Sequence, residues 1–277
     1  MNRYLKLVNL EVSRVAKVLF GGLAALFIIQ MIGVWITSNQ YMSRANEAIM
    51  NGESVQSIVD NYSYMSMLSF SDKIYFIGPI ALCVGAVFFY IFLIWYRDWS
   101  GKNTFIYRLL MLPTARLSVY FAKATAIMII IFTMVAAQMV FILIESSFME
   151  LLTPAEYLKE ATISQMASYN IYLYYIIPGT FTEFILYYGG GFIFLTVLFT
   201  AILMERSFRW KGLFLGLIYI VFAVFLTLSP IEVLIMLDKA DYFYPSEVVY
   251  MTIASSMVTG ALSVWISHYL LNKKVTV

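Results

Sequence analysis

Residues 117 to 144 read LSVYFAKATAIMIIIFTMVAAQMVFILI, and Lys123 is the one charged residue among them. A helix needs about 20 mostly apolar residues to cross a hydrocarbon layer about 30 Å thick. Of the 277 residues in the chain, 62% are hydrophobic and 12% are charged, whereas about 25% are charged in an ordinary soluble domain. The sequence therefore predicts a helical integral membrane protein.

Six apolar stretches have the length of a membrane span. They cover residues 18–37, 74–96, 117–144, 181–204, 212–230 and 248–271, with boundaries good to a few residues. The fourth is the least regular, because Glu183 lies near its start and Gly189, Gly190 and Gly191 fall inside it. We predict an all-α membrane fold with six transmembrane helices in one domain that covers residues 1–277.

The lysines and arginines predict how the chain is oriented in the membrane. Of these 18 residues, 13 lie in the two terminal segments and in the connections after the second and fourth spans, and Lys123 lies near the inner end of the third span. The other connections hold four: Arg44, Lys73, Lys159 and Lys239. Because basic residues are retained on the cytoplasmic side, we expect both termini to lie in the cytoplasm.

Residues 1–17 form a basic segment with helical periodicity. Leu5, Val8, Val12 and Val15 share one face, while Arg3, Lys6, Ser13 and Lys17 lie on another. The pattern predicts an amphipathic helix on the membrane surface, in contact with anionic lipids. A plain cytoplasmic tail is the alternative. No small-residue cleavage site follows the apolar stretch, so we expect no cleaved signal peptide.

Two connections on the predicted outer side are too long to be turns, residues 38–73 and 145–180. In the second, TPAEYLKEA predicts a helix start, with Thr153 as the N-cap, Pro154 in the first turn and Glu156 three residues after the cap. The tyrosine-rich stretch that follows predicts an interfacial or re-entrant piece that ends at Pro178 and Gly179.

The connection after the second span is the most specific local feature. Residues 97–123 read RDWSGKNTFIYRLLMLPTARLSVYFAK, in which Phe105, Leu109 and Leu112 recur at helical spacing before Pro113. The spacing predicts a short amphipathic helix parallel to the membrane. Arg116 and Lys123 follow where the chain re-enters the bilayer.

This segment resembles the coupling helix of type-2 ABC exporter permeases, in which a Leu-Pro and a small-x-Arg sequence lead through a lysine into the third span. The layout of the whole chain is similar to Firmicutes-type peptide-resistance and peptide-export permeases, with the tail LLNKKVTV at residues 270–277. The resemblance implies that segment 97–116 contacts an ATPase. The coupling residues would be Asp98, Trp99, Lys102, Phe105, Arg108, Leu109, Leu112, Pro113 and Arg116.

The same resemblance implies partners and a cargo. Cytoplasmic ABC ATPase subunits, a second permease subunit that is identical or homologous, and membrane lipids are the expected partners, and nucleic acid is not. The cargo would be an amphipathic or hydrophobic molecule, such as a peptide antibiotic, a secreted peptide or a lipid-linked molecule. The expected location is the bacterial cytoplasmic membrane, with a role in antimicrobial peptide resistance or peptide export.

Catalytic and cofactor motifs are missing from the sequence. No phosphate-binding G-x-x-x-x-G-K-[ST] loop is present, so we expect ATP and magnesium to be bound by the partner ATPase and no cofactor by this chain. His268 is the single histidine and Cys83 the single cysteine, which excludes a two-histidine metal site and an intrachain disulfide. We therefore expect a transport subunit and not an enzyme.

Ionisable residues in or beside spans are candidates for function, because a charge in hydrocarbon is costly. Lys123 can snorkel to the inner headgroups. Two interpretations fit the three glutamates near the outer boundary: they lie at the membrane interface, or they line a polar outer vestibule. These glutamates are Glu145, Glu183 and Glu232. Two small-residue pairs, Gly21 with Ala25 and Gly212 with Gly216, are candidates for close helix packing. Gln30 and Gln138 are interpreted as hydrogen-bonding links between helices.

The sequence leaves two other functional classes open. An ion-coupled secondary transporter would need internal repeats or intramembrane charges that bind an ion. A membrane scaffold or sensor would need no ATPase.

Overall fold

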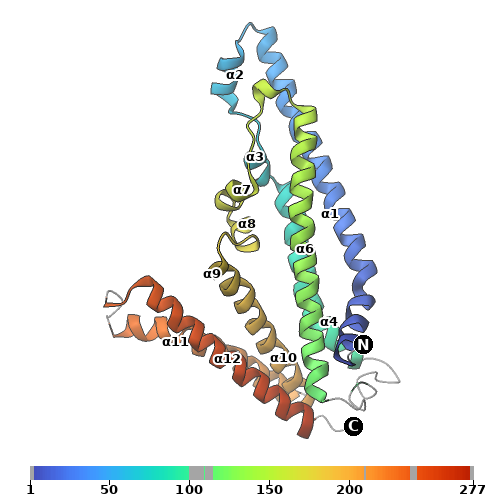
Figure 1. Ribbon diagram of the computed structural model, residues 1–277, viewed down its shortest axis with the longest axis vertical. Coiled ribbons are helices and arrows are strands. Elements are labelled where there is room, and N and C mark those ends of the chain that lie inside the picture. The colour runs from blue at the N-terminus through green and yellow to red at the C-terminus, as the bar shows by residue number, and fades with distance from the viewer. Residues whose placement is uncertain (1–2, 100–108, 110–114, 209, 238–241, 275–277) are drawn as a thin grey trace. The chain divides into compact units, whose positions relative to one another are not determined.

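The computed structural model describes residues 3–99, 109, 115–208, 210–237 and 242–274 (Figure 1). Six helices are long and apolar enough to cross a membrane: α1 (Arg3–Met50), α4 (Ile74–Trp99), α6 (Arg116–Leu152), the run Phe181–Phe208, α11 (Trp210–Met236) and α12 (Pro245–Lys273). No strand occurs among the described residues. A helix bonds its own backbone groups, as lipid requires. The prediction of an all-α membrane fold with six spans is confirmed.

The chain divides into two compact units. Unit 1 comprises Met1–Ser13, Phe88–Met128 and Thr182–Val277, and unit 2 comprises Arg14–Val87 and Ile129–Phe181. The helices α1, α4 and α6 contribute to both units.

Two of the helices are much longer than the spans predicted for them. α1 has 48 residues and α6 has 37, which at about 1.5 Å per residue gives lengths of about 72 Å and about 55 Å. Because the hydrocarbon layer is only about 30 Å thick, both helices must extend beyond it. Helix α1 also continues unbroken past residue 17, so the predicted surface helix is the first part of α1. Its placement on the membrane surface stays a prediction.

In unit 2, the two long connections fold together into what we term the connector lobe, residues 51–73 and 153–180. It contains α2 (Val55–Tyr62), α3 (Met67–Ser71), the 3₁₀ turn η1 (Ala155–Tyr157), α7 (Ile163–Tyr169) and α8 (Ile171–Ile176). The N–H of Met65 donates to the Tyr157 carbonyl, and the N–H of Lys159 donates to the Met65 carbonyl, both at 2.9 Å. The two connections are thus joined backbone to backbone.

The helix start predicted at Thr153 is wrong. Helix α6 continues to Leu152, the buried Thr153 hydroxyl caps no helix, and Pro154 precedes only the single turn η1. Leu158 is extended and pairs with Met65 as an isolated bridge, so the tertiary pairing prevails over the local helix signal. The capping box lies further on, where the Thr162 hydroxyl accepts from the Gln165 N–H at the start of α7.

Asn170 joins the two halves of the connector lobe. Its Nδ2 donates to the Ser71 carbonyl at 2.9 Å and to Asp72 Oδ1 at 3.2 Å, while its Oδ1 accepts from the N–H groups of Tyr172 and Leu173 at the start of α8. The side chain is only 3% exposed. It therefore caps a helix and bonds to the opposite connection at once.

We expect Asn170→Ala to destabilise the connector lobe by about 1–3 kcal/mol, because a helix cap and buried hydrogen bonds are lost together. The expected result is faster trypsin cleavage after the exposed residues Lys73 and Lys159. Asn46→Ala is the matched control, since Asn46 is exposed on α1. Equal cleavage rates in the two variants would contradict the proposed linking role.

The fourth span is irregular near its start, in the region of its glycines. Helix α9 (Phe181–Phe184) passes into a π-helical turn, η2 (Ile185–Gly189), before α10 (Gly190–Phe208) begins. A π-helical turn adds a residue to the helix and interrupts its regular hydrogen bonding.

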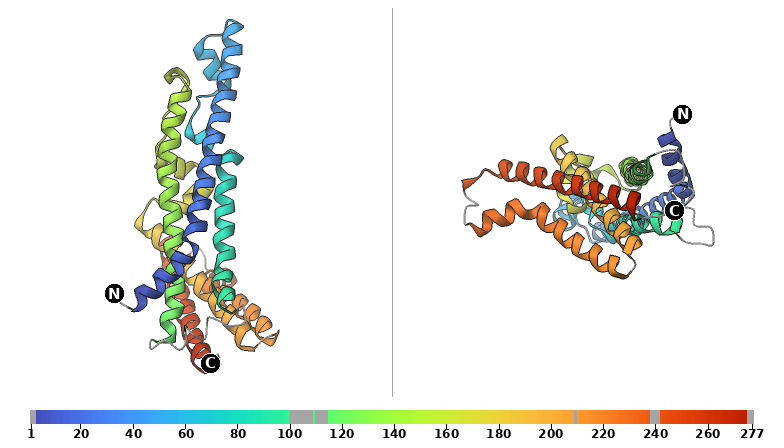
Figure 2. Two further views of the ribbon diagram at one scale, coloured as in Figure 1. Left: turned by 90° about the vertical axis from the view of Figure 1, so that its right-hand side faces the viewer. Right: turned by 90° about the horizontal axis from the view of Figure 1, so that it is seen from below.

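In unit 1, α10, α11 and α12 lie side by side (Figures 1 and 2) and pack through small and hydroxyl-bearing residues. Gly212 and Gly216 of α11 lie against the backbone of α10 at Met204 and Ala201. The Thr200 hydroxyl of α10 lies 2.9 Å from that of Ser267 of α12. Close approach and hydroxyl hydrogen bonds are the usual means by which helices pack in lipid.

Candidate functional site: a buried charge cluster

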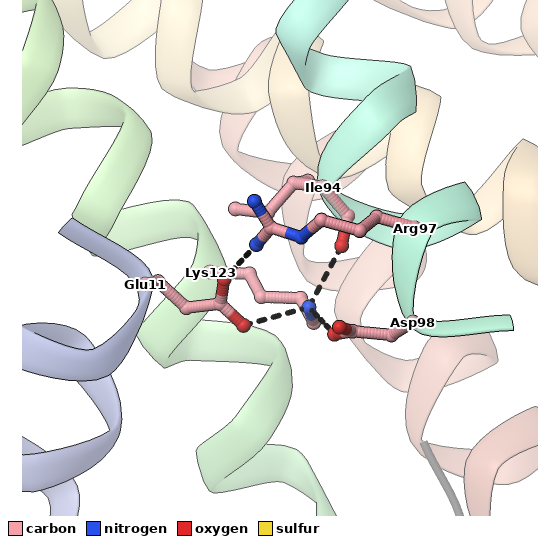
Figure 3. Close-up of polar contacts among 5 residues, drawn as sticks. All are labelled: Glu11, Ile94, Arg97, Asp98 and Lys123. Carbon is pink, nitrogen blue, oxygen red and sulfur yellow. Dashed lines mark hydrogen bonds and ion pairs between the residues drawn. The ribbon is translucent and has the colours of Figure 1, made fainter. Parts of the chain in front are cut away.

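Four charged side chains from three helices meet in unit 1 (Figure 3). Glu11 lies on α1, Arg97 and Asp98 lie at the end of α4, and Lys123 lies on α6. We call these four residues the charge cluster. Lys123 Nζ donates to Glu11 Oε1 at 2.9 Å, to the Ile94 carbonyl at 2.8 Å, and to Asp98 Oδ2.

The charge cluster is balanced in both charge and hydrogen bonding. A lysine ammonium has three N–H donors, and each of the three acceptors named above takes one. The other oxygen of Glu11 accepts from Arg97 Nη2 at 2.7 Å. Among the described residues, two carboxylates therefore face one ammonium and one guanidinium, and the charges of these four side chains sum to zero.

Burial makes this balance necessary. The Lys123 side chain is 0% exposed and that of Glu11 is 3% exposed, whereas Arg97 is 30% exposed. Removing a charge from water carries a penalty of several kcal/mol, which only close pairing and further hydrogen bonds offset. The expectation that Lys123 snorkels to the headgroups is wrong, because its ammonium finds all three acceptors inside the protein.

The first turns of α1 hold Glu11 in place. Tyr4, Leu7 and Val8 lie on the same helical face as Glu11, and all three pack toward α6. The Tyr4 hydroxyl lies 2.6 Å from that of Thr125, while Leu7 and Val8 pack with Val119, Ala122 and Leu109. This part of the predicted amphipathic helix therefore binds protein along one face.

An aromatic group lies beside the charge cluster. The Trp95 ring lies 5.2 Å from Lys123 Nζ and contacts Phe199 of α10 edge-on, with centroids 5.3 Å apart. Tyr120 packs against the same Phe199 ring and donates to the Thr196 carbonyl at 3.2 Å. The ammonium gains a cation–π contact, and the rings link α4 and α6 to α10.

The ends of α4 and α6 make further contacts within unit 1. The Tyr96 hydroxyl donates to the Glu205 carboxylate, and the Arg206 guanidinium lies 4.3 Å from the Tyr96 ring. Arg116 Nη1 donates to the Leu271 carbonyl of α12 at 2.5 Å. Both helices that flank the 97–116 connection are thus attached to the bundle of α10, α11 and α12.

Four of the predicted coupling residues are described by the structure. Asp98 is buried in the charge cluster, Trp99 lies 5.8 Å from the Arg206 guanidinium, and Leu109 is 4% exposed beside Leu7 and Val119. Arg116 begins α6. The remaining five lie outside the described residues: Lys102, Phe105, Arg108, Leu112 and Pro113.

The three glutamates of the predicted vestibule differ in their surroundings. Glu145 is fully buried in unit 2. Glu183 is partly exposed and Glu232 is exposed, and both belong to unit 1. A vestibule that all three share stays a prediction.

The two small-residue pairs also differ. Gly212 and Gly216 pack inside unit 1, as described above. Gly21 and Ala25 are exposed on α1, and no atom of the described residues lies within 4 Å of a Cβ added at Gly21. Close helix packing at this second pair stays a prediction.

Glu11 is the member of the charge cluster that the sequence interpretation missed. It is the one acidic residue among the first 46, and it lies on the helical face of Val8, Val12 and Val15. An acid on the apolar face of a basic helix was the available signal, because such a residue needs a partner inside the protein.

The described residues contain no group of three or more His, Cys, Asp or Glu side chains that could hold a metal ion. No protein-family model, no curated protein and no solved structure matches the chain. The fold and the charge cluster define the chain as a polytopic helical membrane protein with a buried ion-pair cluster between α1, α4 and α6.

Proposed function

We propose that the chain is the permease subunit of an ATP-driven exporter. The charge cluster is the observation that carries this proposal. It ties α1, α4 and α6 together where α4 ends and the 97–116 connection begins. Arg116, at the other end of that connection, bonds to α12. A force applied to the connection would therefore be passed to several spans together.

In this proposal, separate cytoplasmic ATPase subunits bind the 97–116 segment, and ATP with magnesium is held by them. Two permease subunits, identical or homologous, form the pathway. When the ATPase subunits bind ATP and close together, they move the 97–116 segment. The spans attached to this segment then shift, and the pathway changes from being open on one side of the membrane to being open on the other. The excess of basic residues supports cytoplasmic termini in a bacterial cytoplasmic membrane. An amphipathic or hydrophobic cargo, such as a peptide, follows from the resemblance.

The double variant Phe105→Glu/Leu112→Glu tests the docking. We expect it to lose co-purification with the cognate ATPase, because two carboxylates would replace the apolar side of the proposed coupling helix. Leu109 is left unchanged, since it is buried against α1 and α6 and its substitution would disturb the fold. Measured ATP turnover stimulated by the permease should fall in parallel.

Trp210→Glu is the matched control, because Trp210 is 82% exposed and lies in another segment predicted to be cytoplasmic. It should retain the ATPase. Undiminished association and ATP turnover in the double variant would defeat the proposed coupling role.

A further inference from the structure

Glu145 is a buried acid that takes no part in the charge cluster. It lies on α6 in unit 2 and is 0% exposed. Neither of its carboxyl oxygens has a hydrogen-bond partner among the described residues. Glu11 and Asp98, by contrast, both bind the Lys123 ammonium.

The surroundings of Glu145 are apolar. One turn on either side, Ile142 and Met149 are 2% and 1% exposed and belong to a hydrophobic cluster with Val34 and Phe76. The partly buried residues that pack against this cluster include Tyr41, whose hydroxyl donates to the Ser63 carbonyl at 2.9 Å.

Two glutamines near this region also have unsatisfied atoms. Gln138 lies two turns before Glu145 on the same face of α6, and neither of its amide atoms has a partner among the described residues. Gln30 of α1 donates to the Phe76 carbonyl at 3.3 Å, but its Oε1 has no such partner. Buried polar atoms are rarely left unbonded in native proteins.

The burial of the Glu145 carboxyl group and its lack of hydrogen-bond donors among the described residues limit the kind of ligand that it can bind. An ionised carboxylate without a cation or N–H donor is very unfavourable in an apolar interior. A hard metal ion would need six or more oxygen ligands, and an organic cation would need space beside a carboxyl group that is 0% exposed. A proton needs neither.

We infer that Glu145 is a proton-binding site within α6. The bound proton removes the negative charge and lets this face of α6 pack against Val34 and Phe76. Release of the proton leaves a carboxylate that must reach water or a cation, so release requires the packing around Ile142 and Met149 to open. Proton binding is thereby linked to the conformation of unit 2.

Infrared absorption of the purified protein in lipid nanodiscs at neutral pH tests the inference. We expect the unchanged protein to show a carbonyl band of a protonated carboxylic acid, and Glu145→Gln to lack it. Glu150→Gln is the matched control, because Glu150 is exposed on the same helix, and it should keep the band. Glu145→Met serves the same purpose if the amide prevents folding. An identical spectrum in the unchanged protein and the Glu145 variant would overturn the inference.

The link to opening has a test of its own. After transfer into heavy water, the band shifts as deuterium replaces the proton, and we expect Ile142→Ala to speed this shift several-fold. An unchanged exchange rate would overturn the link. Neither measurement uses an ATPase, so these outcomes are independent of those of the co-purification experiment.

Discussion

Lys123→Met is expected to destabilise the protein by about 3–5 kcal/mol, the loss typical when one partner of a buried ion pair is removed. The substitution keeps an unbranched side chain but leaves the Glu11 and Asp98 carboxylates without their shared ammonium. The Ile94 carbonyl also loses its side-chain donor. The thermal unfolding midpoint of the purified protein in detergent should fall sharply.

A surface lysine provides the control for this experiment, and a second substitution in the charge cluster should restore the lost stability. Lys17→Met removes an exposed lysine from α1 and should change the midpoint little, since surface charges contribute at most about 1 kcal/mol. The double variant Lys123→Met/Asp98→Leu leaves the Glu11–Arg97 pair neutral and should recover much of the lost stability. If Lys123→Met unfolds at the same temperature as Lys17→Met, the buried ion pairs do not form.

The six spans were predictable from sequence because lipid imposes a local requirement. Each span must bond its own backbone groups and present apolar side chains over about 20 residues, and both properties are visible within a short window. The same short windows underestimated the lengths of helices α1 and α6. Beyond the hydrocarbon layer a helix can continue with polar residues, as α1 does from Ser38 to Met50, and hydropathy alone does not report it.

The charge cluster was not predictable in the same way, because its members are far apart in sequence. Glu11 and Lys123 are separated by 112 positions, and Glu11 and Arg97 by 86. Seen alone, Lys123 has a long side chain near a span end and fits snorkelling. Only the packing of α1 and α4 against α6 brings Glu11 and Asp98 to it.

The same limit applies to the cap predicted at Thr153. The sequence TPAEYLKEA satisfies the local rules for a helix start, but the hydrogen bonds of Met65 with Tyr157 and Lys159 hold Leu158 in an extended pairing. Local propensity is a weak prior that tertiary contacts override. Gly212 and Gly216 are a different case, since their spacing alone indicated close packing and left only the partner helix undetermined.

Gly212→Ala is expected to destabilise unit 1 by about 1–3 kcal/mol, the range for overpacking a close contact. An added Cβ would lie 2.8 Å from Glu205 Cα and closer still to the Met204 carbonyl oxygen. Both atoms belong to the backbone of α10, which cannot turn aside as a side chain can. Helices α10 and α11 would have to separate. The hydrogen bond between Tyr219 of α11 and Ser263 of α12, now 2.7 Å, starts about two turns further along α11.

Three glycine variants make this argument quantitative when their unfolding midpoints are compared. At Gly216 the added Cβ would lie 3.0 Å from the Ala201 carbonyl oxygen, so Gly216→Ala should cost less than Gly212→Ala. Gly85 of α4 has no atom of the described residues within 4 Å of such a Cβ, and Gly85→Ala should be neutral or stabilising through its higher helix propensity. The loss of stability should be largest for Gly212→Ala, smaller for Gly216→Ala and absent for Gly85→Ala, because the added Cβ lies progressively further from the backbone of a neighbouring helix. A loss at Gly85 equal to that at Gly212 would instead mean that the contact between α10 and α11 does not set the stability of this bundle.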